Sequence, residues 1–338
     1  GELKDTLMHF NDPQAIALES DGNILIADGR IKRFSSEGEF LAEIGESKGD
    51  YEGSLVEPLN LAVDAEGKIF VSDKRTGPPR IQAFAPDGEY LYGFAPKGVA
   101  PQRVMDTRGM AVNSKQQLYV GDIDNIRVSV FENSGELLQN IGKKGAYPGE
   151  LNVPYGLAID PNDDLFVASY FGPCQKFTPD GYFLGGFLFP DPPGGPVYLT
   201  DVACDHFGDV YILVKGAQAP DGEYGAVKDA EGDRYEIAKY NNNGDFITHI
   251  SLAEPGRKAR RLTVDEYGRL LVLFESEEQI GVEVLEPMAG NTGQAQARTM
   301  EYKTHWQWSE AIDDPEYFNE PHCIEPDGNG NLLIADMN

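Results

Sequence analysis

The sequence predicts an all-β fold built from repeated antiparallel sheets, and three periodic features carry this prediction. A short apolar strand recurs seven times in the 338 residues, a second strand follows each copy at a constant distance, and a third strand ends on an aromatic residue four places before a glycine. Constant offsets between apolar segments are typical of a protein made from one repeated supersecondary unit.

The first strand is apolar over most of its length, which suits a sheet that is covered on both faces. The fourth positions of successive copies are 45, 49, 47, 45, 60 and 62 residues apart. The copies are 14–18, 59–63, 108–112, 155–159, 200–204, 260–264 and 322–326.

The second strand completes a hairpin of fixed length, because its penultimate residue lies ten places after the fourth position of the first strand in every copy. A glycine often occupies the turn, as tight hairpins require. The penultimate residues are Ala27, Ser72, Gly121, Ala168, Leu213, Leu273 and Ala335, and the turn glycines are Gly22, Gly67, Gly208 and Gly268.

The third and fourth strands complete a four-stranded meander. A fourth strand follows the glycine, as in residues 39–44. Meanders that stack face to face around an axis form a β-propeller. The third strands end at Phe34, Phe84, Phe131, Phe177 and Tyr240.

The repeat resembles that of the NHL family. Residues 56–94 show the pattern best, with Asp-Ala-Glu-Gly at 64–67, a second strand that ends at Asp73, Arg-Ile-Gln-Ala-Phe at 80–84 and Asp-Gly at 87–88. The fifth and sixth copies depart from it, because Val214 and Phe274 replace the aspartate after the second strand. The resemblance implies a propeller, but the family includes scaffolds, receptors and a few enzymes, so it implies no single function.

The two ends of the chain predict how the ring closes. The sequence contains seven first and second strands but six clear third strands, and it ends soon after the last second strand. Residues 1–3 match the turn before a fourth strand, which residues 7–10 would form. We therefore expect a single domain over 1–338, with seven blades favoured over six and the ring closed by pairing of the N- and C-terminal strands.

Charge narrows the classes of partner. Acidic residues number 56 against 28 basic residues, which gives a formal charge of −28. Such a surface repels a phosphate backbone, so we expect no nucleic-acid partner. No stretch is apolar enough to cross a membrane, and the acidic, turn-rich composition suggests an extracytoplasmic (periplasmic or secreted) location, although a cytoplasmic one stays open.

Polar residues at the beginning of the first strands are candidates for binding a ligand or partner. The loops before these strands and after the second strands should share one face, at the mouth of the central channel. The alternative is that they only face channel water. The residues are Gln14, Asn60, Arg108, Tyr155, Asp201, Arg261 and His322.

Carboxylates at the ends of the second strands form a second candidate site. Ring symmetry should bring them to one rim, where they could hold a hard cation such as Ca²⁺. The alternative is that each caps a turn by accepting backbone N–H bonds. The residues are Asp28, Asp73, Asp122 and Asp336.

Two long insertions could enlarge the same face, since long loops on a rigid scaffold often carry binding. They span 216–234 and 287–320. The second contains Trp306 and Trp308, whose alternate positions put both rings on one side of a strand. An exposed pair would bind a partner, whereas a buried pair would close the sixth blade.

Two functions follow from these features. The first is a non-catalytic interaction propeller that presents its loop-rich face to a protein, peptide or assembly partner. The second is a metal-dependent lyase or hydrolase at the channel mouth, because the amidating-lyase branch of NHL-like propellers combines a metal, a tyrosine and an arginine. A catalytic zinc needs about three protein ligands, and His322 alone among five histidines lies at a channel position, so the sequence favours the binder.

Overall fold

The structure is a computed structural model, and the residues that it describes form strands and no helix. Consequently none of them belongs to a helix that could span a membrane. The all-β prediction is confirmed. The described residues are 15–19, 21, 23–35, 40–46, 51–74, 80–187, 197–216, 234–252, 258–264, 268–275, 279–287, 302–311, 323–326 and 332–335.

Among the described residues, six sheets contain four antiparallel strands each, in sequence order, and a seventh contains two. The chain divides into two compact units, Gly1–Pro96 with Ile312–Asn338, and Lys97–Ala311. The sheets of the first unit are β1 (Ala15–Leu18), β2 (Ile24–Asp28), β3 (Arg30–Phe34) and β4 (Phe40–Ile44); β5 (Pro58–Val63), β6 (Ile69–Asp73), β7 (Ile81–Phe84) and β8 (Tyr90–Phe94); and the pair β25 (Cys323–Pro326) and β26 (Leu332–Ala335).

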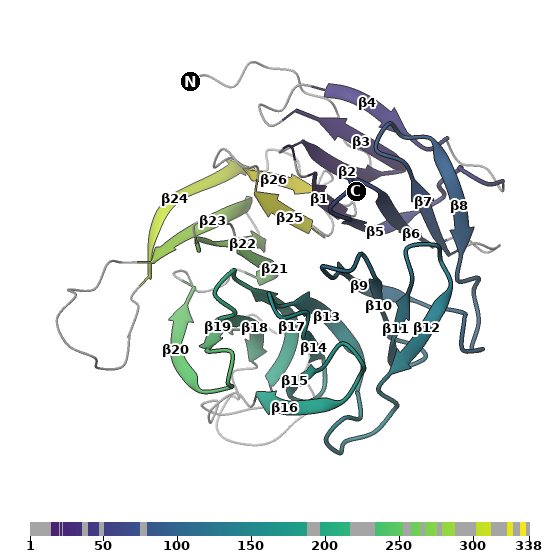
Figure 1. Cartoon of the computed structure of the whole chain (residues 1–338). Coiled ribbons are helices and arrows are strands. Elements are labelled where there is room, and N and C mark those ends of the chain that lie inside the picture. Colours follow the sequence, from purple (N-terminus) through teal and green to yellow (C-terminus); the bar gives the residue numbers. More distant parts are fainter. Residues whose placement is uncertain are drawn as a thin grey trace. The chain divides into compact units, whose positions relative to one another are not determined.

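The second unit holds the other four sheets. The first strand of each sheet lies beside the first strand of the next, so that β9, β13, β17 and β21 follow one another (Figure 1). The sheets are β9 (Thr107–Val112), β10 (Leu118–Asp122), β11 (Arg127–Phe131) and β12 (Leu137–Ile141); β13 (Pro154–Ile159), β14 (Leu165–Ser169), β15 (Cys174–Phe177) and β16 (Phe183–Phe187); β17 (Val197–Cys204), β18 (Val210–Gly216), β19 (Arg234–Tyr240) and β20 (Phe246–Ser251); and β21 (Lys258–Val264), β22 (Leu270–Glu275), β23 (Gln279–Pro287) and β24 (Tyr302–Ala311).

The predicted hairpins are confirmed, and the second strands of the first four copies end as predicted, whereas β18 and β22 continue to Gly216 and Glu275. Five third strands end at the predicted aromatic residues, from Phe34 to Tyr240. Residues 217–233 separate the second and third strands of one sheet, as expected for the first insertion. The segment 287–320 differs from a plain insertion, because Tyr302–Ala311 within it forms β24, the fourth strand of its sheet.

One side chain caps the turn between the first and second strands in the second to fifth repeats, and in the third repeat this residue is Asn113. Asp64, Asp160 and Asp205 each accept the N–H groups two and four residues later through Oδ1, at 2.8–2.9 Å. The residue three places after the capping residue adopts a positive φ. Gly67 supplies it at 83°, whereas Gln116 adopts 64° at the same position of the next repeat. The turn is therefore specified by the cap more strictly than by the glycine.

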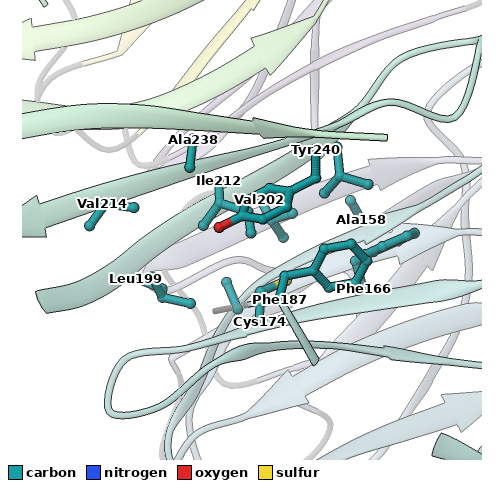
Figure 2. Packing of buried hydrophobic residues seen from close by; sticks show 12 residues of the cluster. Ala158, Phe166, Cys174, Phe187, Leu199, Val202, Ile212, Val214, Ala238 and Tyr240 are labelled. Atoms are coloured by element: carbon teal, nitrogen blue, oxygen red, sulfur yellow. The ribbon is translucent and has the colours of Figure 1, made fainter. Parts of the chain in front are cut away.

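The core lies between the faces of successive sheets. Apolar side chains of β13–β16 and β17–β20 point toward one another in Figure 2. Phe187 of the first sheet meets Tyr240 of the second edge to face, with 5.4 Å between ring centres. All five residues of β6, β10 and β14 are buried, because each second strand is covered on both sides. This explains the near-continuous apolar pattern of the sequence.

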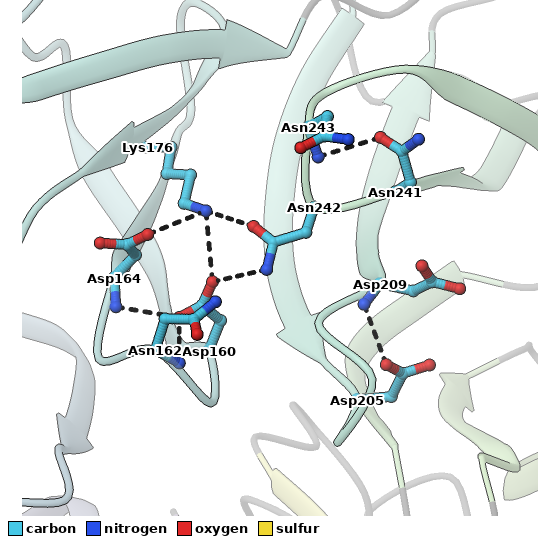
Figure 3. Close-up of polar contacts among 9 residues, drawn as sticks. All are labelled: Asp160, Asn162, Asp164, Lys176, Asp205, Asp209, Asn241, Asn242 and Asn243. Atoms are coloured by element: carbon cyan, nitrogen blue, oxygen red, sulfur yellow. Dashed lines mark hydrogen bonds and ion pairs between the residues drawn. The ribbon is translucent and has the colours of Figure 1, made fainter.

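Buried charge also joins these two sheets. The ammonium of Lys176 lies 3.2 Å from Asp160 Oδ2 and 2.9 Å from Asp164 Oδ2, and it donates to the side chain of Asn242 as well (Figure 3). Asn242 in turn donates to Asp160 at 3.0 Å. The turn cap of one sheet is thus bound to the third–fourth strand turn of the next.

Candidate functional site

A β-bulge lies at the beginning of the first strand in five of the described sheets. At each, the pairing with the second strand skips one residue. A bulge turns the side chain of the extra residue away from the regular pleat. The skipped residues are Leu59, Arg108, Tyr155, Thr200 and Arg260.

The bulges separate the predicted binding residues into two groups. Arg108 and Tyr155 are themselves bulge residues, whereas Asn60, Asp201 and Arg261 each lie one position later and pair normally. The sequence pattern placed both groups in one set, because an extra residue at a bulge leaves no mark on hydrophobic periodicity.

Arg108 and Tyr155 come together. The guanidinium carbon of Arg108 lies 5.7 Å from the centre of the Tyr155 ring, which is within the range of a cation–π contact. Both side chains are half-buried. Because β9 and β13 are neighbours, their two bulges bring a cation and an aromatic ring together at one end of the sheets.

Three further aromatic residues extend this contact. Tyr170 and Phe171 follow β14 directly, and Tyr198 lies near the beginning of β17. The Tyr170 ring lies 5.6 Å from that of Tyr155 and stacks on Tyr198 at 4.8 Å, with an interplanar angle of 26°. The Phe171 ring meets Tyr170 at 4.9 Å and Tyr198 at 5.6 Å, edge to face in both cases.

We call Arg108, Tyr155, Tyr170, Phe171 and Tyr198 the arginine–aromatic cluster. Phe171 is 49% exposed, so the cluster reaches solvent. The Arg108 Nε atom is buried and has no hydrogen-bond partner among the described residues. The cluster thus offers stacking surface and a cation that the described protein leaves without an acceptor.

The strand-end carboxylates are used inside their own sheets. Asp73 accepts the N–H groups of Val56 at 3.0 Å and of Glu57 at 2.7 Å. Asp122 accepts from the backbone of Met105 at 3.1 Å and from the side chain of Asn125 at 2.6 Å. Burial raises the pKa of Asp122 above its usual value, against the effect of these hydrogen bonds. Both therefore act as turn caps.

The calcium site stays a prediction. The side chain of Asp28 and the whole of Asp336 lie outside the described residues. Within the described part of the chain, no three His, Cys, Asp or Glu side chains are grouped so that they could hold a metal ion.

The structure places the other predicted binding residues in different settings. Asp201 is buried, and its carboxylate accepts the N–H of Leu262 at 3.0 Å, which ties β17 to β21. Trp306 and Trp308 occupy alternate positions of β24, opposite Val284 and Val282. Gln14 and His322, together with the side chains of Arg261 and the two tryptophans, lie outside the described residues.

Sequence reasoning missed Tyr170, Phe171 and Tyr198. One signal was present, because Ser169 replaces the repeat's aspartate at the end of β14 just as Val214 and Phe274 do later. A departure from the repeat in the fourth copy marks the place where the aromatic residues gather.

Comparison with solved structures shows the fold. Virginiamycin B lyase from Staphylococcus aureus is 12% identical, with a TM-score of 0.65 over 97% of this chain and 93% of its own. The hydrazine synthase of Kuenenia stuttgartiensis is 11% identical, with a TM-score of 0.67 over 100% and 99%. The WD40 repeats of RRP9 are 14% identical, with a TM-score of 0.66 over 97% and 88%.

These neighbours are β-propellers, so the chain has a β-propeller fold made of sequence repeats. No protein-family model and no curated protein sequence matches the chain. Because the neighbours include a lyase and WD40 repeats, the shared fold does not decide between an enzyme and a binding module.

Proposed function

We propose that the chain is a non-catalytic binding propeller that holds a protein or peptide partner at the arginine–aromatic cluster. The observation that carries this proposal is the group of stacked rings around Tyr170, with Arg108 at one side and the exposed Phe171 at the other. Tyrosine and arginine, together with tryptophan, are enriched at the energetic centres of protein interfaces.

The chemistry of the cluster supports binding over catalysis. Its side chains are phenol and phenyl rings and a guanidinium, which stack and donate hydrogen bonds.

Burial raises the pKa of the Cys174 and Cys204 thiols, and both cysteines belong to or pack against the core cluster of their sheets. These two thiols therefore serve packing rather than nucleophilic attack.

The proposal includes a ring of seven NHL-like blades. Three features support it: the pair β25–β26 repeats the hairpin of a first and second strand, Cys323 pairs with Ala335 as the offset requires, and β25 lies beside β1 in the first unit. A six-bladed ring would leave this apolar hairpin without a place. We also propose an extracytoplasmic location, and a partner other than nucleic acid, on the acidic composition.

Site-specific photo-cross-linking tests the function. Phe171 is replaced by p-benzoylphenylalanine, and the protein is irradiated in an extract of its source organism. Tyr182, which is 72% exposed in the turn between β15 and β16, is replaced in the same way as a control. We expect one discrete adduct from position 171 that position 182 does not give.

The adduct must also depend on the cluster. Introducing Arg108→Ala and Tyr198→Ala together into the position-171 protein should abolish it. The proposal is wrong if the adduct survives these substitutions, if both positions give the same products, or if position 171 gives none.

A further inference from the structure

The repeat itself shows what kind of group the loop before a first strand binds. In two sheets, an aspartate at the end of the second strand accepts a pair of consecutive N–H groups from that loop. Asp73 accepts from Val56 and Glu57 at 3.0 and 2.7 Å, and Asp122 accepts from Met105 and Asp106 at 3.1 and 3.4 Å. A carboxylate is therefore the natural partner of this pair of donors.

The sheet β13–β16 lacks this carboxylate. Ser169 ends β14 and pairs with Pro154, just as Asp73 pairs with Pro58 and Asp122 with Thr107. The equivalent donors are the N–H groups of Asn152 and Val153, and neither has an acceptor among the described residues.

Ser169 leaves a further donor without a partner. Its side chain is 1% exposed, and its Oγ makes no hydrogen bond within the described part of the chain. A buried hydroxyl group without a hydrogen-bond partner costs free energy unless another group forms a hydrogen bond with it. The uncapped loop also holds Val153 at φ 59°, a conformation that is strained for a β-branched residue.

Arg108 places a cation against a residue at the beginning of β13. It stacks on Tyr155, which follows Pro154 directly, and the described residues supply no carboxylate partner for it. This is notable in a chain with 56 acidic residues against 28 basic ones. Ser169 Oγ and Arg108 Nε are thus two buried atoms that have no hydrogen-bond partner among the described residues.

We infer that the partner inserts an acidic side chain beside Tyr155 and an adjacent aromatic side chain against the exposed ring of Phe171. This inference rests on the proposed function and names the chemistry of its partner. The carboxylate takes the role that Asp73 and Asp122 play in their own sheets, with Arg108, Ser169 and the loop N–H groups as donors. A single carboxylate suits the site better than a phosphate, because the formal charge of −28 repels a dianion more strongly.

Two matched peptides test this inference on the full-length protein by isothermal titration calorimetry. Ac-Phe-Asp-Phe-NH₂ carries the carboxylate, and Ac-Phe-Asn-Phe-NH₂ carries a neutral amide of the same shape. We expect the aspartate peptide to bind at least about tenfold more tightly, as a charge-assisted hydrogen bond allows. Sodium acetate, as a free carboxylate, should bind far more weakly than the aspartate peptide because it lacks the aromatic neighbours.

Two variants locate the preference. Ser169→Asp supplies the repeat's own carboxylate and should abolish the discrimination between the peptides, and Arg108→Gln should reduce it. Ser134→Asp adds the same charge at an exposed turn position between β11 and β12 and serves as the control that keeps the preference.

The outcomes separate this inference from the proposed function. Equal affinity for the two peptides, binding of neither, or a preference that persists in Ser169→Asp overturns the inference. Acetate that binds as tightly as the aspartate peptide also overturns it, because the site would then recognise a free carboxylate alone. The proposed function depends on the cross-link at position 171 and survives each of these results.

Discussion

Arg108 lies over the ring of Tyr155 although the two residues begin different sheets, and each is the extra residue of a β-bulge. The repeat therefore does more than stack sheets, because in five of the described sheets it turns one residue out of the regular pleat at the same end of the first strand. Where neighbouring bulges carry a cation and a ring, as at Arg108 and Tyr155, the two side chains come into contact. Five sheets show the bulge, and this pair carries the cation–π contact.

Close approach of first strands depends on Gly156. A Cβ atom added there would lie 2.9 Å from the Cα of Asp201 and 3.0 Å from the backbone N of Val202. Gly156→Ala should therefore destabilise the protein by about 2 kcal/mol, measured by urea denaturation. Gly185→Ala is the control, since nothing lies within 4 Å of its added Cβ. Equal stability of the two variants would contradict this packing.

The buried pair of Lys176 and Asp160 supports the turns. Lys176→Met leaves Asp160 without its cation, next to Asp164, and should lower the free energy of unfolding by about 3 kcal/mol. Lys143→Met removes the pair with Glu150, in which the lysine side chain is 79% exposed, and should change stability little. A small effect at both positions would mean that Asn242 alone satisfies Asp160.

The titration of Asp122 should make the stability of the protein depend on pH. Burial raises its pKa in the folded state above the ordinary value of 3.8 for an aspartate. The folded state then binds the proton more tightly than the unfolded state, so this group's contribution to stability is fully present below about pH 3.8 and is lost as pH rises through the folded pKa.

Asp122→Asn removes this titration. Comparing denaturation of the two proteins from about pH 7 to about pH 4, we expect the wild type to gain stability relative to the variant as pH falls. A stability difference that stays constant over this range, or that changes in the opposite direction, would contradict the raised pKa.

Val153 is held in a left-handed conformation at φ 59°. Val153→Gly relieves that strain and should leave stability unchanged or raise it by about 1 kcal/mol, measured by thermal denaturation. Asp106→Gly, at the equivalent loop position where φ is not positive, should instead destabilise the protein by up to about 1 kcal/mol. The idea fails if Val153→Gly is the more damaging of the two.

The repeated antiparallel sheets could be predicted because constant, short sequence distances separate the strands of each hairpin. The distance from Ala158 to Ala168 fixes one hairpin in the sequence and in the structure alike, and the aromatic residue at Phe177 ends the next strand in both. These features depend on turn length and apolar periodicity, which are local properties of the chain.

The site was predictable in part. Arg108 and Tyr155 can be predicted from their position at the beginning of a first strand, but Tyr198 joins them through packing between sheets, which sequence periodicity does not reveal. Asp201 fits the same sequence pattern as Arg108, yet it lies one residue past the bulge and accepts the N–H group of Leu262. A bulge depends on backbone pairing, so its position cannot be read from composition.

A crystal structure of the protein with Ac-Phe-Asp-Phe-NH₂ tests the central claim most directly. The account predicts the aspartate carboxylate within hydrogen-bond distance of the Arg108 guanidinium and Ser169 Oγ, with a phenyl ring of the peptide against Phe171 or Tyr198. A peptide bound at any other surface, with Arg108 still stacked on Tyr155 and free of the carboxylate, would contradict it.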